Sequence, residues 1–197
     1  MDLAAEIIPL EWIKPKENEP IEAYSKRLSK PIDRSSNFAV MGVSFGGLVA
    51  TEISKQLHPN YSILLSTVQT KNELRPFFQF VGKHDLTKNL PAGMFNPPKS
   101  IAQFMFGAKD TEKLNSILDT TKPHFVKWAI NEMMNWQNKT TISPLLRIHG
   151  TNDRIIPAPK DKSIQLIQGG GHFMVVDQAG IVSQKINNYI LQQQIKL

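Results

Sequence analysis

Ser44 has the neighbours that a nucleophilic serine needs. It lies in the pentapeptide GVSFG, so Gly42 stands two residues before it and Gly46 two residues after it. A short apolar run ends at this pentapeptide, and a helical pattern begins directly after it. A turn that joins a strand to a helix so sharply favours residues without a side chain at both glycine positions. It would present the Ser44 hydroxyl beside a helix N-terminus, whose free N–H groups favour developing negative charge.

The spacing of the glycines is a weak signal alone, since chance gives on the order of 0.1 match in a chain of this length. A serine also needs a base to take its proton and a third group to orient that base. His172 follows three glycines just past an apolar run, and Asp153 stands in HGTNDRIIP, just past the preceding run. Both would lie at the C-terminal edge of a parallel sheet, where α/β proteins carry their sites. Asp153 as a turn residue and His172 as an ordinary loop histidine are the alternatives.

The other four histidines have structural interpretations. We expect His149 to end its strand as a hydrogen-bonded, partly buried residue, and His58 to cap a helix at the surface. We expect His84 and His124 to face solvent, and no third ligand is spaced to make a metal site of His84 and Asp85. The sequence therefore predicts no metal site. Because the chain has no cysteine, it has neither a thiol nucleophile nor a disulfide.

The segments that would position these residues alternate between strand and helix patterns. Strand patterns cover Glu6–Trp12, Asn37–Met41, Tyr61–Thr67, Ile142–His149 and Ser163–Ile167, and helix patterns cover Glu19–Leu28, Gly46–Leu57 and Gly180–Gln193. Such alternation is typical of an α/β fold. We predict a small, mostly parallel sheet of about five to six strands with helices on both faces.

Residues 71–139 differ from the rest of the chain. They contain no convincing strand, show amphipathic helical segments, and hold most of the phenylalanines. We predict that residues 1–70 and 140–197 form the core and that residues 71–139 are a helical cap inserted over one end of the sheet. Aromatic and methionine side chains of the cap either line an apolar substrate pocket or pack in the cap's own core. The pocket candidates are Phe77, Phe78, Phe104, Phe106, Trp128 and Met133.

The segments GVSFGG, HGTNDRIIP and GGGHFMV, in this order, resemble the α/β-hydrolase family. The resemblance covers the chain from Asn37 onward, with the insertion at the family's usual cap position. It implies Ser44 as the nucleophile, His172 as general base and acid, and Asp153 as the residue that orients His172. It also implies that the backbone N–H of Phe45 donates one hydrogen bond in the oxyanion hole. A serine at the nucleophile position argues against the branches of the family that use aspartate or cysteine.

The chain departs from the family before the nucleophile. The family takes a second oxyanion donor from a glycine-containing loop after an earlier strand, but this chain has no glycine before Gly42. We expect an N-terminally incomplete version of the family, with Glu6–Trp12 as the other candidate for the missing strand. Because one oxyanion donor is worth about 2.7–4 kcal/mol, its loss would impair activity. The connection Ile155–Lys162 is also too short and proline-rich for a crossover helix.

The composition fits one globular domain. The chain has 197 residues, 41% of them apolar, and no apolar run approaches the roughly 20 residues of a membrane helix. No secretion signal is recognisable, so we expect a soluble cytoplasmic protein without a membrane partner, as a monomer or homodimer. The net charge is +6, from 23 basic and 17 acidic residues. Because the lysines are scattered, they indicate a solvated surface rather than a nucleic-acid interface.

These features predict a serine hydrolase. It would cleave a small or medium carboxylic ester, or a thioester, through an acyl-enzyme, with a small-molecule substrate and no cofactor. The alternative is an α/β-hydrolase-like protein that binds a ligand in the same place but has impaired or lost catalysis because it lacks the N-terminal oxyanion loop.

Overall fold

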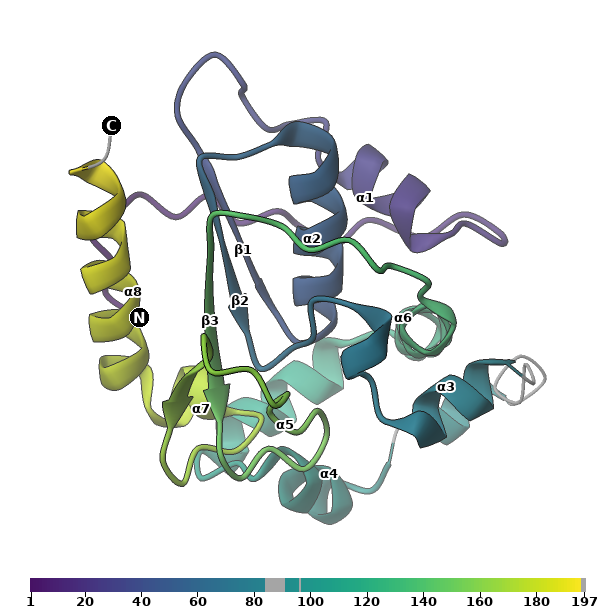
Figure 1. Cartoon of the computed structure of the whole chain (residues 1–197). Helices are drawn as coiled ribbons and strands as arrows, with labels where there is room; N and C mark the ends of the chain where they lie inside the picture. Colours follow the sequence, from purple (N-terminus) through teal and green to yellow (C-terminus); the bar gives the residue numbers. More distant parts are fainter. Residues whose placement is uncertain (84–90, 96, 196–197) are drawn as a thin grey trace.

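The computed structural model describes residues 1–83, 91–95 and 97–195 of the chain. At its centre is a parallel sheet of four strands in the order β1-β2-β3-β4 (Figure 1). The strands are β1 (Ala39–Val43), β2 (Tyr61–Leu65), β3 (Leu145–Gly150) and β4 (Gln165–Ile167). Because every neighbouring pair is parallel, all the strands end at the same edge of the sheet.

The sheet is buried on both faces, as its continuous apolar strands predict. In β2, Leu64 belongs to one core cluster, whereas Ile63 and Leu65 belong to the cluster on the opposite face. Helices α1 (Ile21–Leu28) and α2 (Phe45–Leu57) cover the first face, and α8 (Ala179–Gln194) covers the second (Figure 1). This architecture confirms the predicted α/β fold class with helices on both faces.

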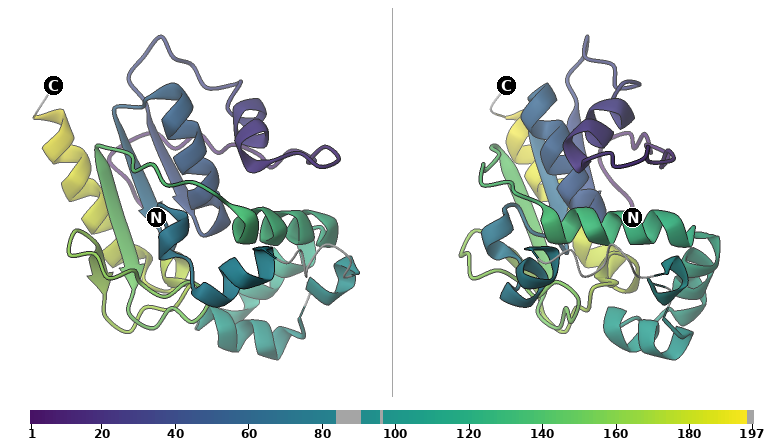
Figure 2. Two further views of the ribbon diagram at one scale, coloured as in Figure 1. Left: turned by 45° about the vertical axis from the view of Figure 1, so that its right-hand side comes forward. Right: turned by 90° about the vertical axis from the view of Figure 1, so that its right-hand side faces the viewer.

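Between β2 and β3, the regular elements that the structure describes are all helices, joined by irregular segments. It forms η1 (Lys71–Glu73), α3 (Pro76–Lys83), η2 (Ala92–Phe95), α4 (Lys99–Phe106), α5 (Thr111–Thr120) and α6 (Pro123–Asn135). These helices gather around the edge of the sheet where the strands end (Figure 2). Helix α6 also packs on the core, since the indole N–H of Trp128 donates to the carbonyl oxygen of Glu19 at 2.9 Å.

The sheet is smaller than predicted. It has four strands within the described residues rather than five or six, because Glu6–Trp12 is not a strand. Pro9 cannot donate a backbone hydrogen bond to a neighbouring strand, and Ile7 and Ile8 are 50% and 75% exposed. Leu10 instead packs on the core cluster next to α1 and α2 without pairing in the sheet. Two short helical elements, α3 and α7 (Met174–Asp177), were not predicted.

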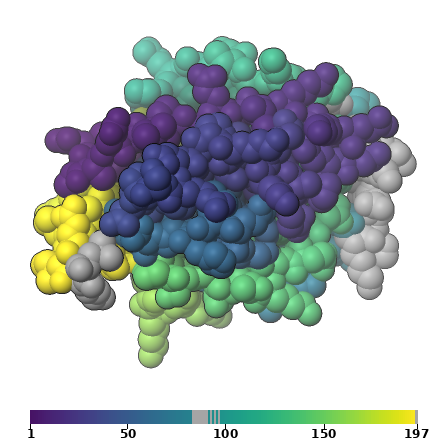
Figure 3. Space-filling view, turned by 90° about the horizontal axis from the view of Figure 1, so that it is seen from above, coloured from purple at the N-terminus to yellow at the C-terminus, as the bar shows by residue number. Residues whose placement is uncertain are grey.

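The N-terminal segment is a strap across the surface of the core. The backbone N–H of Asp2 donates to Ser183 Oγ at 3.1 Å, and that of Ala4 to Asn187 Oδ1 at 2.8 Å, so the strap begins on α8. Figure 3 shows the N-terminal residues, in purple, running over the molecule from α8, in yellow. The strap then reaches the other face of the sheet, where the Trp12 ring lies 6.1 Å from that of Phe45.

No helix in the described part of the chain is long and apolar enough to cross a membrane.

Candidate active site

Ser44 occupies a strained turn between β1 and α2. Its backbone has φ 54° and ψ −125°, a region that residues other than glycine rarely adopt. Three hydrogen bonds hold it there: its N–H donates to the carbonyl oxygen of Leu65 at 3.0 Å, and its own carbonyl oxygen accepts from the Gly47 N–H at 2.8 Å and from Thr67 Oγ1 at 2.7 Å. The turn is thus fixed to the end of β2 next to it.

The glycines of this turn have different roles. A Cβ on Gly42 would lie 2.1 Å from the carbonyl oxygen of Gly46, so position 42 admits only glycine, as predicted. A Cβ on Gly46 would meet only the ring of Trp12, at an ordinary 3.7 Å, so the prediction of a steric need there was wrong. The second steric requirement is at Gly47, whose Cβ would lie 2.2 Å from Thr67 Cγ2.

The structure joins Ser44, His172 and Asp153 in one hydrogen-bonded chain. His172 Nε2 lies 2.8 Å from Ser44 Oγ, and His172 Nδ1 lies 2.8 Å from Asp153 Oδ2. Since an ionised carboxylate can only accept, we assign the proton to Nδ1, which leaves Nε2 free to accept from the serine hydroxyl. His172 is 3% exposed and Asp153 is 5% exposed, so their bond is shielded from water, whereas Ser44 is half-buried.

The loop that carries His172 is held from two sides. On the core side, the backbone N–H of Asn152 donates to the carbonyl oxygen of Gly170 at 2.8 Å. On the other side, the N–H of Phe173 donates to the carbonyl oxygen of Phe106, at the end of α4, at 3.1 Å. The ring of Phe106 also lies edge-on to the imidazole of His172, with 5.4 Å between centroids. These contacts bring the loop after β4 across the sheet edge to Ser44.

Asp153 is held as a carboxylate. Its Oδ1 accepts from the backbone N–H groups of Ile155 at 3.0 Å and Ile156 at 2.9 Å. Burial alone would raise the pKa of Asp153, but hydrogen bonds from His149 and His172, together with the Ile156 N–H, lower its pKa to about 2. The group is therefore negatively charged beside His172 at neutral pH.

His149 contacts this carboxylate, which the sequence did not predict. It is buried and hydrogen-bonded, as expected of a residue at the end of a strand, but its Nε2 lies 3.3 Å from Asp153 Oδ2. The spacing of four residues between His149 and Asp153 across a tight turn is the signal that could have indicated the contact. Of the other histidines, His58 caps α2 and His124 is exposed, whereas His84 lies outside the described residues.

Phe45 is placed to donate from its backbone. It is the first residue of α2, so its N–H has no acceptor within the helix. It follows the nucleophile candidate directly, at the positive end of the helix dipole.

The proposed pocket residues occupy different environments. Phe106 contacts the imidazole of His172, and the ring of Trp128 lies 5.4 Å from that of Phe45. Phe77 and Phe104 are 67% and 66% exposed. Met133 is buried in the core cluster that includes α2. Phe106 thus contacts a member of the candidate site directly, whereas Trp128 contacts the side chain of the residue that follows Ser44.

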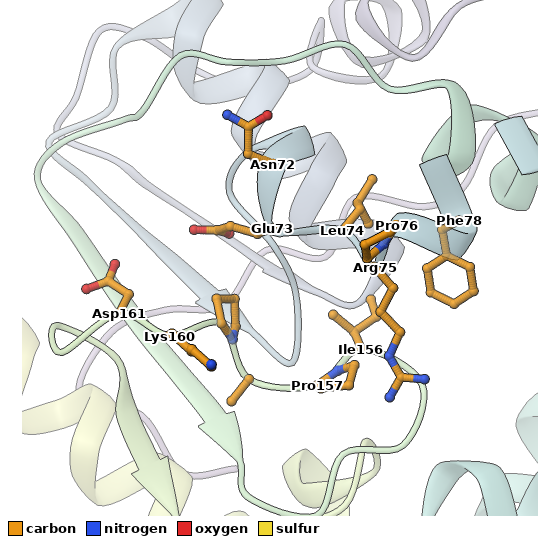
Figure 4. A pocket seen from close by; sticks show the side chains of 12 residues that line it. Asn72, Glu73, Leu74, Arg75, Pro76, Phe78, Ile156, Pro157, Lys160 and Asp161 are labelled. Carbon is orange, nitrogen blue, oxygen red and sulfur yellow. The ribbon is translucent and has the colours of Figure 1, made fainter. Parts of the chain in front are cut away.

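A cavity of about 400 Å³ lies between the segment after β2 and the segment after β3 (Figure 4). Leu74, Phe78 and Ile156 form part of its apolar wall. Behind it, the guanidinium of Arg147 binds both carboxylate oxygens of Glu73, at 2.8 and 2.7 Å. None of Ser44, Asp153 and His172 lines this cavity, so it is distinct from their hydrogen-bonded chain. Within the described residues, no three His, Asp or Glu side chains are grouped to hold a metal ion.

No protein-family model matches the sequence, and no curated protein is similar to it. Solved structures, in contrast, resemble it over most of its length. MenH from S. aureus has a TM-score of 0.66 and 16% identity, over 92% of this chain and 80% of that one. A thermophilic esterase from Thermogutta terrifontis has a TM-score of 0.65 and 18% identity, over 88% of this chain and 73% of that one.

A third structure names the shared architecture. An α/β hydrolase fold protein from Burkholderia ambifaria has a TM-score of 0.56 and 14% identity, over 88% of this chain and 74% of that one. At such low identity, the likeness establishes the fold and not the activity. This likeness agrees with the parallel sheet, the turn at Ser44 and the order of the strands. The chain has the α/β-hydrolase fold.

Proposed function

We propose that the protein is a serine hydrolase that cleaves a small or medium carboxylic ester, or a thioester, through an acyl-enzyme. The observation that carries the proposal is the continuous hydrogen-bonded chain from Ser44 through His172 to Asp153. Such a chain is what a hydroxyl needs to become a nucleophile at neutral pH. The fold, shared with esterases, is consistent with this chemistry.

In the proposed reaction, Ser44 Oγ attacks the carbonyl carbon of the ester while its proton passes to His172 Nε2. The tetrahedral intermediate then expels the alcohol or thiol, which takes the proton from Nε2 and leaves an acyl group on Ser44. A water molecule attacks the acyl carbonyl in the second half, with His172 again as the base. Asp153 stabilises the imidazolium in each half and keeps Nδ1 as the donor.

The negative oxygen of the intermediate requires donors. The backbone N–H of Phe45 supplies one, because it lies next to Ser44 at the start of α2. We also propose that residues 71–139 act as a cap over this site, since the end of α4 contacts the His172 loop. Phe106 and Trp128 would form the apolar wall against the acyl or alcohol group.

A fluorophosphonate probe tests the proposal, because it phosphonylates only an activated serine. We expect the wild-type protein to be labelled on Ser44, as read by peptide mass spectrometry, and Ser44→Ala to lose all labelling. Ser36→Ala, at an exposed serine, is the matched control and keeps full labelling. Folded wild-type protein that remains unlabelled would contradict the proposal and favour the non-catalytic, ligand-binding alternative.

A further inference from the structure

A second imidazole contacts the acidic residue of the candidate site. His149, in β3, is 2% exposed. Its Nε2 lies 2.6 Å from the carbonyl oxygen of Ile156 and 3.3 Å from Asp153 Oδ2. Because the carbonyl oxygen can only accept, Nε2 must carry a proton and donate it to Ile156, with Asp153 Oδ2 as a second, longer contact of the same nitrogen.

The contact places His149 against both sides of the Asp153 turn. His149 donates to the carbonyl oxygen of Ile156, and the N–H of Ile156 donates to Asp153 Oδ1 at 2.9 Å. The backbone of the Asp153 turn thus binds Oδ1, whereas Oδ2 accepts from His172 and lies against His149. Rotation of the carboxylate about its terminal bond would break contacts on both sides at once.

The oxygen that His149 approaches is also the oxygen that accepts from His172 Nδ1, at 2.8 Å. A buried histidine with a purely structural role would be satisfied by the carbonyl oxygen of Ile156 alone. The additional contact instead falls on the atom that orients the proposed general base. A change at His149 is therefore transmitted to His172 through a single carboxylate oxygen.

We propose that His149 is a positioning residue that fixes the orientation of Asp153, and through it the tilt and tautomer of His172. The effect of His149 on catalysis rests on the proposed function. Its effect on the Asp153–His172 hydrogen bond is independent of that function. The side chain acts through Asp153 and takes no proton in the reaction.

Two substitutions separate positioning from packing. His149→Leu fills the buried site with an apolar side chain and removes the donor. His149→Gln places an amide N–H₂ near the position of Nε2 and restores the donor. His124→Leu, at an exposed histidine of α6, is the control for loss of an imidazole elsewhere. His149→Asn, whose amide is one methylene too short to reach, replaces the leucine variant if that variant does not fold.

The first readout is the rate constant of fluorophosphonate labelling at Ser44. We expect it to fall about tenfold in His149→Leu, since the bond to the Ile156 carbonyl and the polar contact with the charged carboxylate are both lost. We expect His149→Gln to label within about threefold of the wild type and His124→Leu to be unchanged. Equal rates in the leucine, glutamine and wild-type proteins would overturn the proposal, as would equal losses in both variants.

The second readout is the low-field ¹H NMR signal of the His172 Nδ1 proton. We expect the signal to shift or broaden in His149→Leu and to return close to its wild-type position in His149→Gln. An unchanged signal in His149→Leu would overturn the proposal. Because the signal needs no turnover, it decides the role of His149 even if the wild-type protein is not labelled, in which case only the proposed function fails.

Discussion

At the scale of single residues, the charge and the hydrogen bonds of Asp153 determine both the orientation of His172 and part of the stability of the folded chain. The carboxylate is buried, yet two backbone N–H groups of its own turn and the His172 imidazole donate to it, and the His149 imidazole lies 3.3 Å away. A group held in this way stabilises the native state as well as orienting His172. The contribution follows from the difference between its pKa of about 2 and the ordinary value of 3.8.

This difference predicts a specific loss of stability in acid. Above about pH 5, both the folded and unfolded chains carry Asp153 as a carboxylate, so its stabilisation is complete. As the pH falls through about 4 toward 2, the unfolded chain binds the proton first, and about 2 kcal/mol of the free energy of unfolding is lost.

Asp153→Asn removes the titrating group and should remove this part of the pH dependence. Urea unfolding of both proteins at about pH 5 and about pH 2.5 measures it, since other acidic groups titrate alike in the two chains. We expect the wild type to lose about 1–2 kcal/mol more than the variant between these values. Parallel losses would show that Asp153 is not held ionised in the folded protein.

At the scale of elements, the strand and helix patterns from Asn37 onward were confirmed because each apolar stripe meets a core. The parallel strands, α2 and α8 lie close to the predicted ranges. The strand predicted at Glu6–Trp12 was wrong because the segment pairs with no strand of the sheet, and Ile7 and Ile8 remain exposed. The structure also unites Ser44, Asp153 and His172, which the sequence placed on one edge, while their catalytic roles stay a proposal.

The need for glycine at position 47 could not be predicted, because its partner Thr67 is brought there only by the pairing of β1 with β2. Substitutions at Gly46 and Gly47, both in the first turn of α2, should therefore differ in their effect on stability. Gly47→Ala places a methyl group 2.2 Å from Thr67 Cγ2, and we expect a loss of about 1–3 kcal/mol in the free energy of unfolding.

Gly46→Ala serves as the matched control. Its methyl group would make an ordinary 3.7 Å contact with Trp12, and alanine is favoured over glycine in a helix. We expect it to be neutral or stabilising by up to about 1 kcal/mol in thermal or urea unfolding. Equal destabilisation by both substitutions would contradict the steric difference between the two positions.

At the scale of the whole molecule, the helices between β2 and β3 are tied to the core by buried polar contacts. The indole N–H of Trp136, which is 2% exposed, donates to Glu52 Oε1 on α2 at 2.8 Å. The N–H of Ile21 donates to Glu132 on α6 at 2.9 Å, and burial raises the pKa of Glu132. We expect these helices and the sheet to unfold together.

Trp136→Phe tests this coupling, because it keeps an aromatic ring and removes the donor to a buried carboxylate. We expect a loss of about 1.5–3 kcal/mol, with a single unfolding transition by both circular dichroism and tryptophan fluorescence. Trp12→Phe, at a ring that is 51% exposed, is the control and should cost less. Separate transitions for the two probes would show instead that these helices unfold independently of the sheet.

The bond between Phe173 and the last turn of α4 has a consequence for access to the hydroxyl. The loop that carries His172 is bonded to the end of α4, so a displacement of α4 would break one of the contacts that hold this loop. The bond from Asn152 to Gly170 and that from His172 to Asp153 would remain. In the proposed reaction, a substrate that displaces α4 would therefore loosen the general base that it needs.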